Sequence, residues 1–284
     1  IENTAGFNYM NRRYYCLLIV LFFAVLIQAA AAERTYNILF VQSYTSQTPW
    51  HSDLNQGLVK GFKESGLKVN ITTEYLDADF WAFNSEKVIM RRFCQRARDR
   101  QTDLIITASD EAFYTLFACG DSLQIPVVFF GIKYPDMELI ATHPNVCGFT
   151  ANPDFDVILR QAQKIFPQRK EVVCVIDNSF LSNKGLEDFE EEWKIFQKDN
   201  PDYRMKVYNT QNHTTSHIIA AICYPRNSYE RLVVAPKWSP FLSFVGKNSK
   251  APVFSSQNVG LTNGVFCAYD SDSYASALSA AQRA

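Results

Sequence analysis

The segment NILFVQSYTSQTPW, residues 37–50, decides how the rest of the chain is interpreted. Residues 38–41 form a continuous apolar run, which is typical of a parallel strand that helices cover on both faces. Ser43, Tyr44 and Trp50 follow at the carboxyl end of that strand. Because ligands of open α/β sheets bind outside the carboxyl ends of the strands, this loop is the first place where we expect function.

The same alternation of apolar runs and amphipathic stretches continues along the chain, which predicts βαβ units around parallel sheets. Strands are predicted at residues 37–42, 69–75, 103–107, 126–130, 172–176, 205–208, 232–235, 253–255 and 265–269, with 172–176 central in a second sheet. Helices are predicted at residues 51–65, 86–100, 111–119, 155–165, 184–198, 214–223 and 273–284.

Two of these helices carry further signals. In the helix at 51–65, Gly57 and Gly61 are expected to allow close approach to the sheet. The helix at 111–119 is expected to be capped by Ser109 or Asp110.

The series of elements divides near residues 148–153, which predicts an α/β fold of two lobes, each a parallel sheet flanked by helices. The expected organisation is a signal peptide over 1–32, an amino-terminal lobe over 36–148, a carboxyl-terminal lobe over 149–268, and the start of a return crossover over 269–284. The last helix has no cap or stop signal, so we expect the polypeptide to continue past Ala284.

Charge and the first residues limit the classes of function. The 284 residues carry 28 basic and 29 acidic side chains, a net charge of −1, so no basic surface points to nucleic acid. Arg12 and Arg13 precede an apolar run at 16–27 and alanines at 29–32, which is the order of a secretory signal cleaved before Glu33, with Met10 as the expected start. A retained membrane anchor is the alternative, although residues 16–32 are marginal for spanning about 30 Å of hydrocarbon.

Six cysteines follow the signal: Cys94, Cys119, Cys147, Cys174, Cys223 and Cys267. An even number in an exported chain permits disulfides. Cys174 and Cys267, however, lie inside strand-like segments, where cysteine behaves as a small buried hydrophobe, so we favour buried free thiols. The chain has no CxxC pair, so neither a zinc knuckle nor a thioredoxin-type centre is indicated.

Catalytic motifs are incomplete. TASDEA, residues 107–112, places Ser109 beside Asp110 and Glu111, but no histidine that could act as a base is near in the sequence. A helix amino terminus whose free amides also face the ligand is favoured over a nucleophile. We therefore expect no catalytic residue.

A metal site is weakly indicated at HTTSH, residues 213–217. His213 and His217 have the i, i+4 spacing of a zinc helix, but Thr214 replaces the glutamate of HExxH. Exposed histidines are favoured, and we expect neither a metal nor a cofactor.

Large aromatic residues gather in predicted loops and at strand ends: Tyr44, Trp50, Phe80, Trp81, Tyr134, Phe180 and Trp238. Pockets for small ligands combine such rings with a few polar groups. The alternative is that the rings cover sheet edges; for Tyr44 and Trp238 we favour the ligand cleft.

The segments NILFVQSYTSQTPWHSDLNQGLVKGF, DLIITASDEAFYTL, IPVVFFGIKYPD, NVCGF and KIFPQRKEVVCVIDNS together resemble the ABC-transporter substrate-binding-like family, over about residues 36–281. The resemblance implies a type I periplasmic-binding-protein fold with the ligand between two lobes, as in the extracytoplasmic sensor domains of bacterial histidine kinases. The ligand-binding residues that it implies are Ser43, Tyr44, Trp50, Ser109, Asp110, Glu111, Gly131 and Tyr134 in the first lobe, and Asp177, Asn178, Lys237, Trp238 and Gln257 in the second.

The expected function is non-catalytic binding of a small organic solute in the cleft, as the sensor input of a membrane signalling protein, with a histidine kinase module downstream. Such a domain lies in the periplasm or on the extracytoplasmic face of the inner membrane. Closure would use hinges near residues 148–151 and 269–272. The alternative is a free-standing ABC-transporter substrate-binding protein that delivers its ligand to a permease.

Overall fold

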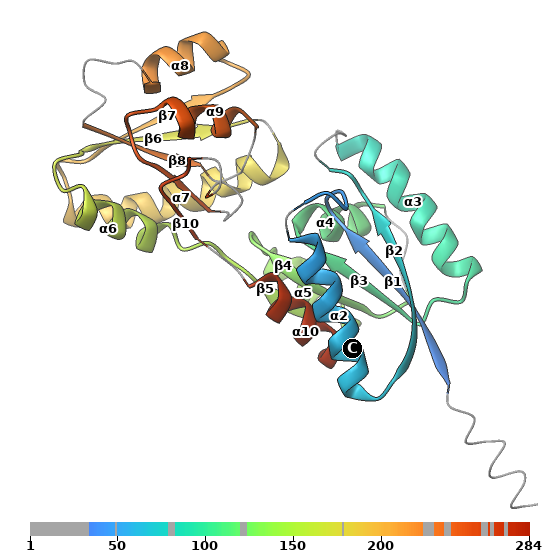
Figure 1. The fold of residues 1–284 in the computed structure, drawn as a ribbon. Helices are drawn as coiled ribbons and strands as arrows, with labels where there is room; N and C mark the ends of the chain where they lie inside the picture. The colour runs from blue at the N-terminus through green and yellow to red at the C-terminus, as the bar shows by residue number, and fades with distance from the viewer. Residues whose placement is uncertain are drawn as a thin grey trace, which may run out of the picture. The chain divides into compact units, whose positions relative to one another are not determined.

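Two five-stranded parallel sheets flanked by helices form the fold (Figure 1). The computed structural model describes residues 34–48, 50–78, 83–119, 124–177, 179–223, 230–235, 240–256, 261, 264–269 and 272–284. The first sheet has the strand order β2-β1-β3-β4-β5, and the second has the order β10-β9-β8-β6-β7. The predicted two-lobed α/β class is confirmed.

The elements of the first sheet occupy the first half of the chain. Its strands are β1 (Thr35–Gln42), β2 (Lys68–Tyr75), β3 (Leu104–Ala108), β4 (Val127–Ile132) and β5 (Val146–Thr150). Its helices are α2 (His51–Ser65), α3 (Phe83–Asp99), α4 (Asp110–Ala118) and α5 (Met137–Ala141).

The elements of the second sheet follow in the same alternation. Its strands are β6 (Glu171–Ile176), β7 (Arg204–Asn209), β8 (Arg231–Ala235), β9 (Val253–Ser255) and β10 (Cys267–Ala268). Its helices are α6 (Phe155–Ile165), α7 (Phe180–Asp199), α8 (Thr215–Cys223) and α9 (Pro240–Asn248). One more helix, α10 (Ser273–Arg283), follows β10.

The two sheets repeat one topology. In each sheet, the first strand lies between the second and the third. The chain therefore adds one strand on one side of the first strand and the next strands on its other side, and we call this place the reversal point. The pairings of β1 with β3 and of β6 with β8 are both parallel. Loops that leave two strands at such a reversal diverge to opposite faces of the sheet, and the opening between them is where α/β sheets bind ligands.

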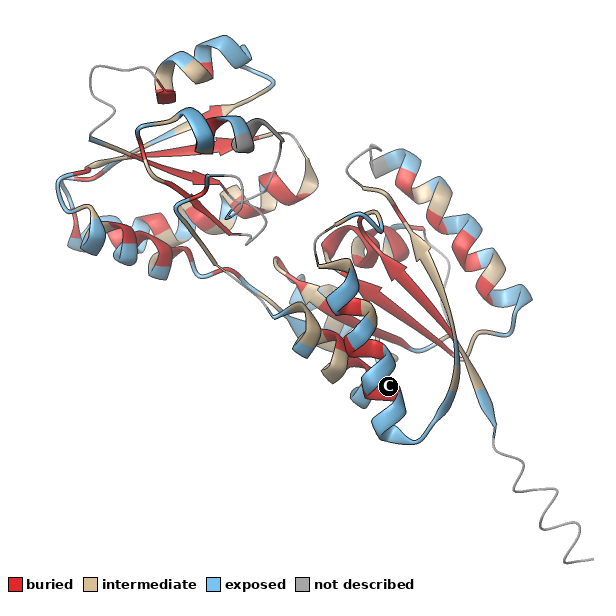
Figure 2. Cartoon of the chain, in the orientation of Figure 1, coloured by how far each residue is buried: buried red, intermediate tan, exposed pale blue. Residues whose placement is uncertain are grey.

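Apolar clusters cover both faces of each sheet, which explains the continuous apolar runs of the inner strands. Figure 2 shows these inner strands as buried. In β1, Leu39 and Val41 face the cluster formed with α3 and α4, whereas Ile38 and Phe40 face the cluster formed with α2 and α10. β3 is buried at all five positions. Burial of both faces holds the carboxyl ends of these strands in fixed register.

Helix α10 belongs to the first sheet, although it is last in the described chain. Its Ala277, Ala280 and Ala281 are buried in the same cluster as Leu58 and Phe62 of α2. Figure 1 shows α10 beside α2.

The two glycines of α2 serve this helix contact. A Cβ atom at Gly57 would lie 2.5 Å from the carbonyl oxygen of Tyr274, and one at Gly61 would lie 2.5 Å from Cβ of Ala281. The expectation that these glycines allow close approach to the sheet is therefore wrong, because they allow the close approach of α10 instead.

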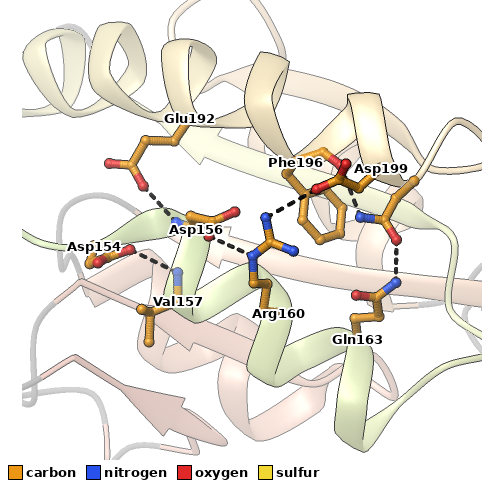
Figure 3. A network of polar contacts seen from close by, with 9 residues as sticks. Asp154, Asp156, Val157, Arg160, Gln163, Glu192, Phe196 and Asp199 are labelled. Atoms are coloured by element: carbon orange, nitrogen blue, oxygen red, sulfur yellow. Dashed lines mark hydrogen bonds and ion pairs between the residues drawn. The ribbon is translucent and has the colours of Figure 1, made fainter.

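A polar network joins α6 to α7 in the second half (Figure 3). Asp154 caps α6 with its side chain, and Glu192 of α7 accepts a hydrogen bond of 2.6 Å from the backbone amide of Asp156. Arg160 donates to the carboxylate of Asp156 at 2.6 Å and to that of Asp199 at 3.4 Å. These contacts fix the first helix of the second lobe against its longest one.

Several sequence predictions need correction. β5, α5 and α9 were not predicted, and β10 covers two residues where residues 265–269 were expected. β5 contains Gly148, and its Phe149 is exposed, so it lacks the continuous apolar run that is typical of a strand covered on both faces. The expected hinge at 148–151 overlaps this strand. β6 is an inner strand of the second sheet, but the middle strand is β8.

Candidate ligand-binding site

Ser43 connects the two loops that leave the reversal point of the first sheet. Its Oγ donates to the carbonyl oxygen of Ala108 at 2.8 Å and accepts from the backbone amide of Ala112 at 2.9 Å. Its own amide also donates to Ala108 O, at 3.2 Å. Since Ala112 is the third residue of α4, Ser43 acts as the amino-terminal cap of that helix from another strand.

Ser109 does not cap α4 with its side chain, which corrects the sequence prediction. Its backbone has φ 71° and ψ 170°, a conformation that residues other than glycine rarely adopt. The Ser109 amide donates to Phe130 O at 3.0 Å, and Gly131, which follows Phe130, also has a positive φ of 69°. Strained backbone of this kind gathers at functional sites, and here it lies at the carboxyl ends of two adjacent strands.

Asp110 does not cap α4 either. Its carboxylate accepts hydrogen bonds from the backbone amides of Lys133 and Tyr134, each at 3.0 Å, and so holds the loop between β4 and α5. The pKa of Asp110 is raised from 3.8 to about 7: burial is the main cause and the neighbouring Glu111 carboxylate adds to it, while the two amides and the Lys133 charge oppose the rise. The side chain is 1% exposed, so its first role is to position this loop.

Tyr44 and Glu111 form a second link between the β1 and β3 loops. The Tyr44 hydroxyl donates to Glu111 Oε1 at 2.9 Å, and both side chains are buried. Trp50 packs edge-on against Tyr44, with ring centroids 5.8 Å apart, and remains partly exposed. Trp50 therefore offers ring surface at this edge, and Tyr44 fixes the orientation of that ring.

The loop between β4 and α5 also contacts the second half of the chain. Tyr114 of α4 donates to Tyr134 O at 2.5 Å and accepts from the Asp136 amide at 2.7 Å. Lys133 Nζ donates to Ser256 O at 2.8 Å, and the Tyr134 ring is buried in the apolar cluster that includes Phe155 and Phe254 of the second half. Tyr134 is thus a core residue at this junction.

The corresponding edge of the second sheet is described in part. Asp177 follows β6, and its Oδ1 accepts from the backbone amide of Ser179 at 2.9 Å and from its hydroxyl. Ser179 in turn caps α7 through the amide of Ser182. The other predicted residues of this edge, Asn178, Lys237, Trp238 and Gln257, lie outside the described residues, as do Phe80 and Trp81.

A histidine outside the predicted ligand-binding set also joins this edge. His51, the first residue of α2, lies 3.2 Å from Gln42 Oε1, and its ring packs 5.5 Å from that of Tyr75. Gln42 is 2% exposed, and its Nε2 has no hydrogen-bond partner within the described part of the chain. The amino-terminal position of His51 in α2, directly after the loop of residues 43–50, was the signal that could have identified it.

The other sequence candidates for chemistry are not assembled into a metal centre. His213 is partly buried and His217 is exposed, and both rings pack near Tyr208. No group of three or more histidine, cysteine, aspartate or glutamate side chains suited to a metal ion occurs among the described residues. Cys174 is fully buried, whereas Cys267 is only partly buried.

Solved structures place this arrangement among known folds. Over 87% of its length the chain matches a conserved domain protein from Vibrio cholerae O1 biovar El Tor, with a TM-score of 0.68, 15% identity and 83% of that chain covered. The chain has the type I periplasmic-binding-protein fold. This agrees with the fold that the sequence resemblance implied.

Two further structures with this fold are similar. An ABC domain from Streptococcus pneumoniae solved in complex with L-Trp has a TM-score of 0.66 and 15% identity, with 87% of this chain and 83% of that chain covered. A periplasmic sugar-binding protein of an ABC transporter from Legionella pneumophila has a TM-score of 0.60 and 16% identity, with 87% and 92% covered. No protein-family model matches the sequence, and no curated protein sequence matches it. At these identities the likeness establishes the periplasmic-binding-protein fold.

Proposed function

We propose that the protein is an extracytoplasmic, non-catalytic domain that binds a small organic solute at the carboxyl ends of its two sheets. The observation that carries this proposal is the reversal point of the first sheet, where Ser43, Tyr44, Ser109 and Glu111 meet. Rings and backbone amides that converge at such a point suit a small ligand with polar groups.

The division of roles within the proposed site follows from the contacts. Ser43, Asp110 and Tyr134 are engaged within the protein and position the loops. Trp50 and Ser109 are partly exposed and are proposed to contact the ligand. Asp177, Asn178, Lys237, Trp238 and Gln257 are proposed as the contribution of the second lobe.

Ligand screening tests this function. One structural neighbour was solved with L-Trp, so the twenty amino acids are the first compounds to screen by thermal shift, followed by a set of monosaccharides. A compound that raises the melting temperature is then titrated by calorimetry. Trp238→Ala is expected to weaken binding by roughly 1 to 3 kcal/mol, the scale of one large buried ring, without unfolding the protein.

Matched variants make the test decisive. Tyr44→Ala is expected to weaken binding as well, whereas Ile195→Ala, on an exposed position of α7, is expected to leave affinity unchanged. Unchanged affinity in both the Trp238 and Tyr44 variants would refute the site.

The cellular context is a finer proposal. We favour the input domain of a membrane sensor histidine kinase over a transport binding protein that serves a permease. Sequencing past Ala284 separates them, because a sensor requires a membrane span followed by a kinase module. No helix among the described residues is long and apolar enough to cross a membrane.

For export, we expect bacterial expression to yield a mature amino terminus near Glu33 by mass spectrometry; recovery of only full-length membrane-bound protein would contradict cleavage.

A further inference from the structure

A cavity of about 270 Å³ lies between α3 and the strands β1 and β2 of the first sheet. Asn70, Thr72 and Glu74 line it from β2, Arg96 lines it from α3, and Arg100 lines it from the turn directly after α3. Pockets for drug-sized ligands have volumes of roughly 300–1,000 Å³, so this cavity suits a smaller, metabolite-sized compound. Figure 1 shows α3 running beside β2.

The residues of β2 that face this cavity are polar. β2 is an edge strand of the first sheet and is partly exposed. Its other face is apolar, where Val69 and Ile71 pack against the cluster of α2 and α10. On the α3 face, Asn70, Thr72 and Glu74 present polar groups to the cavity. A few polar groups beside an apolar surface are typical of a small-molecule pocket.

Hydrogen-bond donors dominate the polar wall. Arg96 directs Nε and Nη2 to Glu74 Oε1, at 3.0 and 2.7 Å, which neutralises that carboxylate. Arg100, an exposed residue directly after the end of α3, donates to the Thr72 hydroxyl at 3.3 Å. Within the described chain the Arg100 guanidinium has no carboxylate partner. A planar guanidinium held in this way is suited to a carboxylate ligand.

The floor of the cavity is apolar. Leu39 of β1 and Ala97 of α3 line it, and both are buried in the cluster between the sheet and α3. A ligand here meets a cationic rim and a hydrocarbon floor together.

We propose that this cavity binds a small organic carboxylate, with the carboxylate group on Arg100 and the hydrocarbon part against Leu39 and Ala97. The site is separate from the reversal point, because it lies toward the amino ends of β1 and β3, where Asn37 and Thr102 also line it. It does not depend on the proposed function.

Titration with simple acids tests the proposal. Acetate, butyrate, hexanoate and inorganic phosphate are each titrated at constant ionic strength, by calorimetry and by ¹H–¹⁵N NMR. Hexanoate is expected to bind at least tenfold more tightly than acetate, because added methylene groups are buried on the apolar floor. Saturable shifts are expected at the amides of Asn70, Thr72 and Arg100. Phosphate binding as tight as that of hexanoate would overturn the assignment to organic acids.

Two arginine variants provide the matched comparison. Arg100→Gln is expected to weaken hexanoate binding at least tenfold. Arg92→Gln makes the same charge change at an exposed position of α3 that does not line the cavity, and is expected to stay within twofold. If both variants lost the same hexanoate affinity, general surface charge would explain the binding, and the proposal would be overturned. Shifts that centre on residues 43–50 and 109–111 would do the same, because the acid would then occupy the other site.

Discussion

A single buried hydroxyl organises the carboxyl edge of the first sheet. Ser43 Oγ donates to the end of β3 and accepts from the first turn of α4, so one side chain replaces the cap that Ser109 does not provide. Ser109 is thereby left in its strained conformation with its amide on Phe130 O. The geometry of the edge depends on a residue 69 positions away from the amide that it caps.

Ser43→Ala is expected to lower the free energy of unfolding by about 1 to 2 kcal/mol, because α4 loses its cap and Ala108 O loses a buried donor. Urea unfolding followed by circular dichroism measures this. Ser46→Ala, in the exposed part of the same loop, is the control. A loss for Ser43→Ala no larger than that of the control would contradict the capping role.

Asp110 makes stability depend on pH. Its pKa in the folded protein is raised to about 7, above the 3.8 of its ordinary value, so between these pH values the folded state binds more proton than the unfolded state. Its contribution to stability is therefore greatest at low pH and is lost as the pH rises from about 4 to about 7. The expected slope approaches about 1.4 kcal/mol per pH unit near pH 5 to 6.

Unfolding free energies at pH 5, 6, 7 and 8 test this for the unaltered chain and for Asp110→Asn. The unaltered chain is expected to lose unfolding free energy relative to Asp110→Asn as the pH rises to about 7. Above that pH the difference between the two proteins is expected to stay constant. Asp53→Asn, at an exposed position of α2, controls for the loss of a carboxylate elsewhere. A difference that is constant over the whole range would show that Asp110 ionises equally in both states.

Sequence reasoning located residues of this edge, but the capping role that it gave to Ser109 or Asp110 is wrong. Strand-end logic selected Ser43 and Tyr44, the family resemblance added Asp110 and Glu111, and the structure brings these residues together. Capping rules are local, however, so they assigned the α4 cap to Ser109 or Asp110, whereas it comes from Ser43. The carboxylate of Asp110 likewise binds amides 23 and 24 residues further along the chain.

At the scale of elements, the contact between α2 and α10 closes one face of the first sheet. Gly57 and Gly61, one turn apart on α2, leave room for the backbone of α10 at Tyr274 and for the side chain of Ala281. Small residues on both helices bring the two backbones close together. The pair therefore tolerates little added volume.

Gly61→Ala is expected to destabilise the protein by about 1 to 3 kcal/mol, despite the better helix propensity of alanine, because the added methyl group meets Ala281. Chemical unfolding provides the measurement. Gln56→Ala, on the exposed side of α2, should change stability by no more than about 0.5 kcal/mol. Stabilisation by Gly61→Ala would mean that α10 does not pack as described.

Long elements with a clear period were predictable from the sequence, and short ones were not. α2 and α6 have the bounds that their apolar spacing indicated. α5 has five residues and β5 has an exposed end, so neither carries enough repeats to give a period. The packing of α10 on α2 depends on distant parts of the chain, and local pattern does not encode it.

For the whole molecule, the proposed function makes a prediction about size. If a solute binds to both lobes, the compact state is favoured only by the ligand's higher affinity for it. Small-angle X-ray scattering is expected to show a smaller radius of gyration at saturating ligand. With Trp238→Ala, a higher ligand concentration is expected to be needed for the same change. An unaltered radius at proven saturation would argue against closure.

The return of α10 to the first sheet sets an order for folding during synthesis. Gln282 of α10 donates to Glu64 at the end of α2, across 218 positions of sequence. While a ribosome is still making the second lobe, the first lobe exposes the apolar side of α2 that Ala277 and Ala281 later cover. Such a surface is open to chaperones and to aggregation until the last helix emerges. The described elements from β6 to β10 follow one another in the sequence and are all made before α10, which the first sheet still awaits.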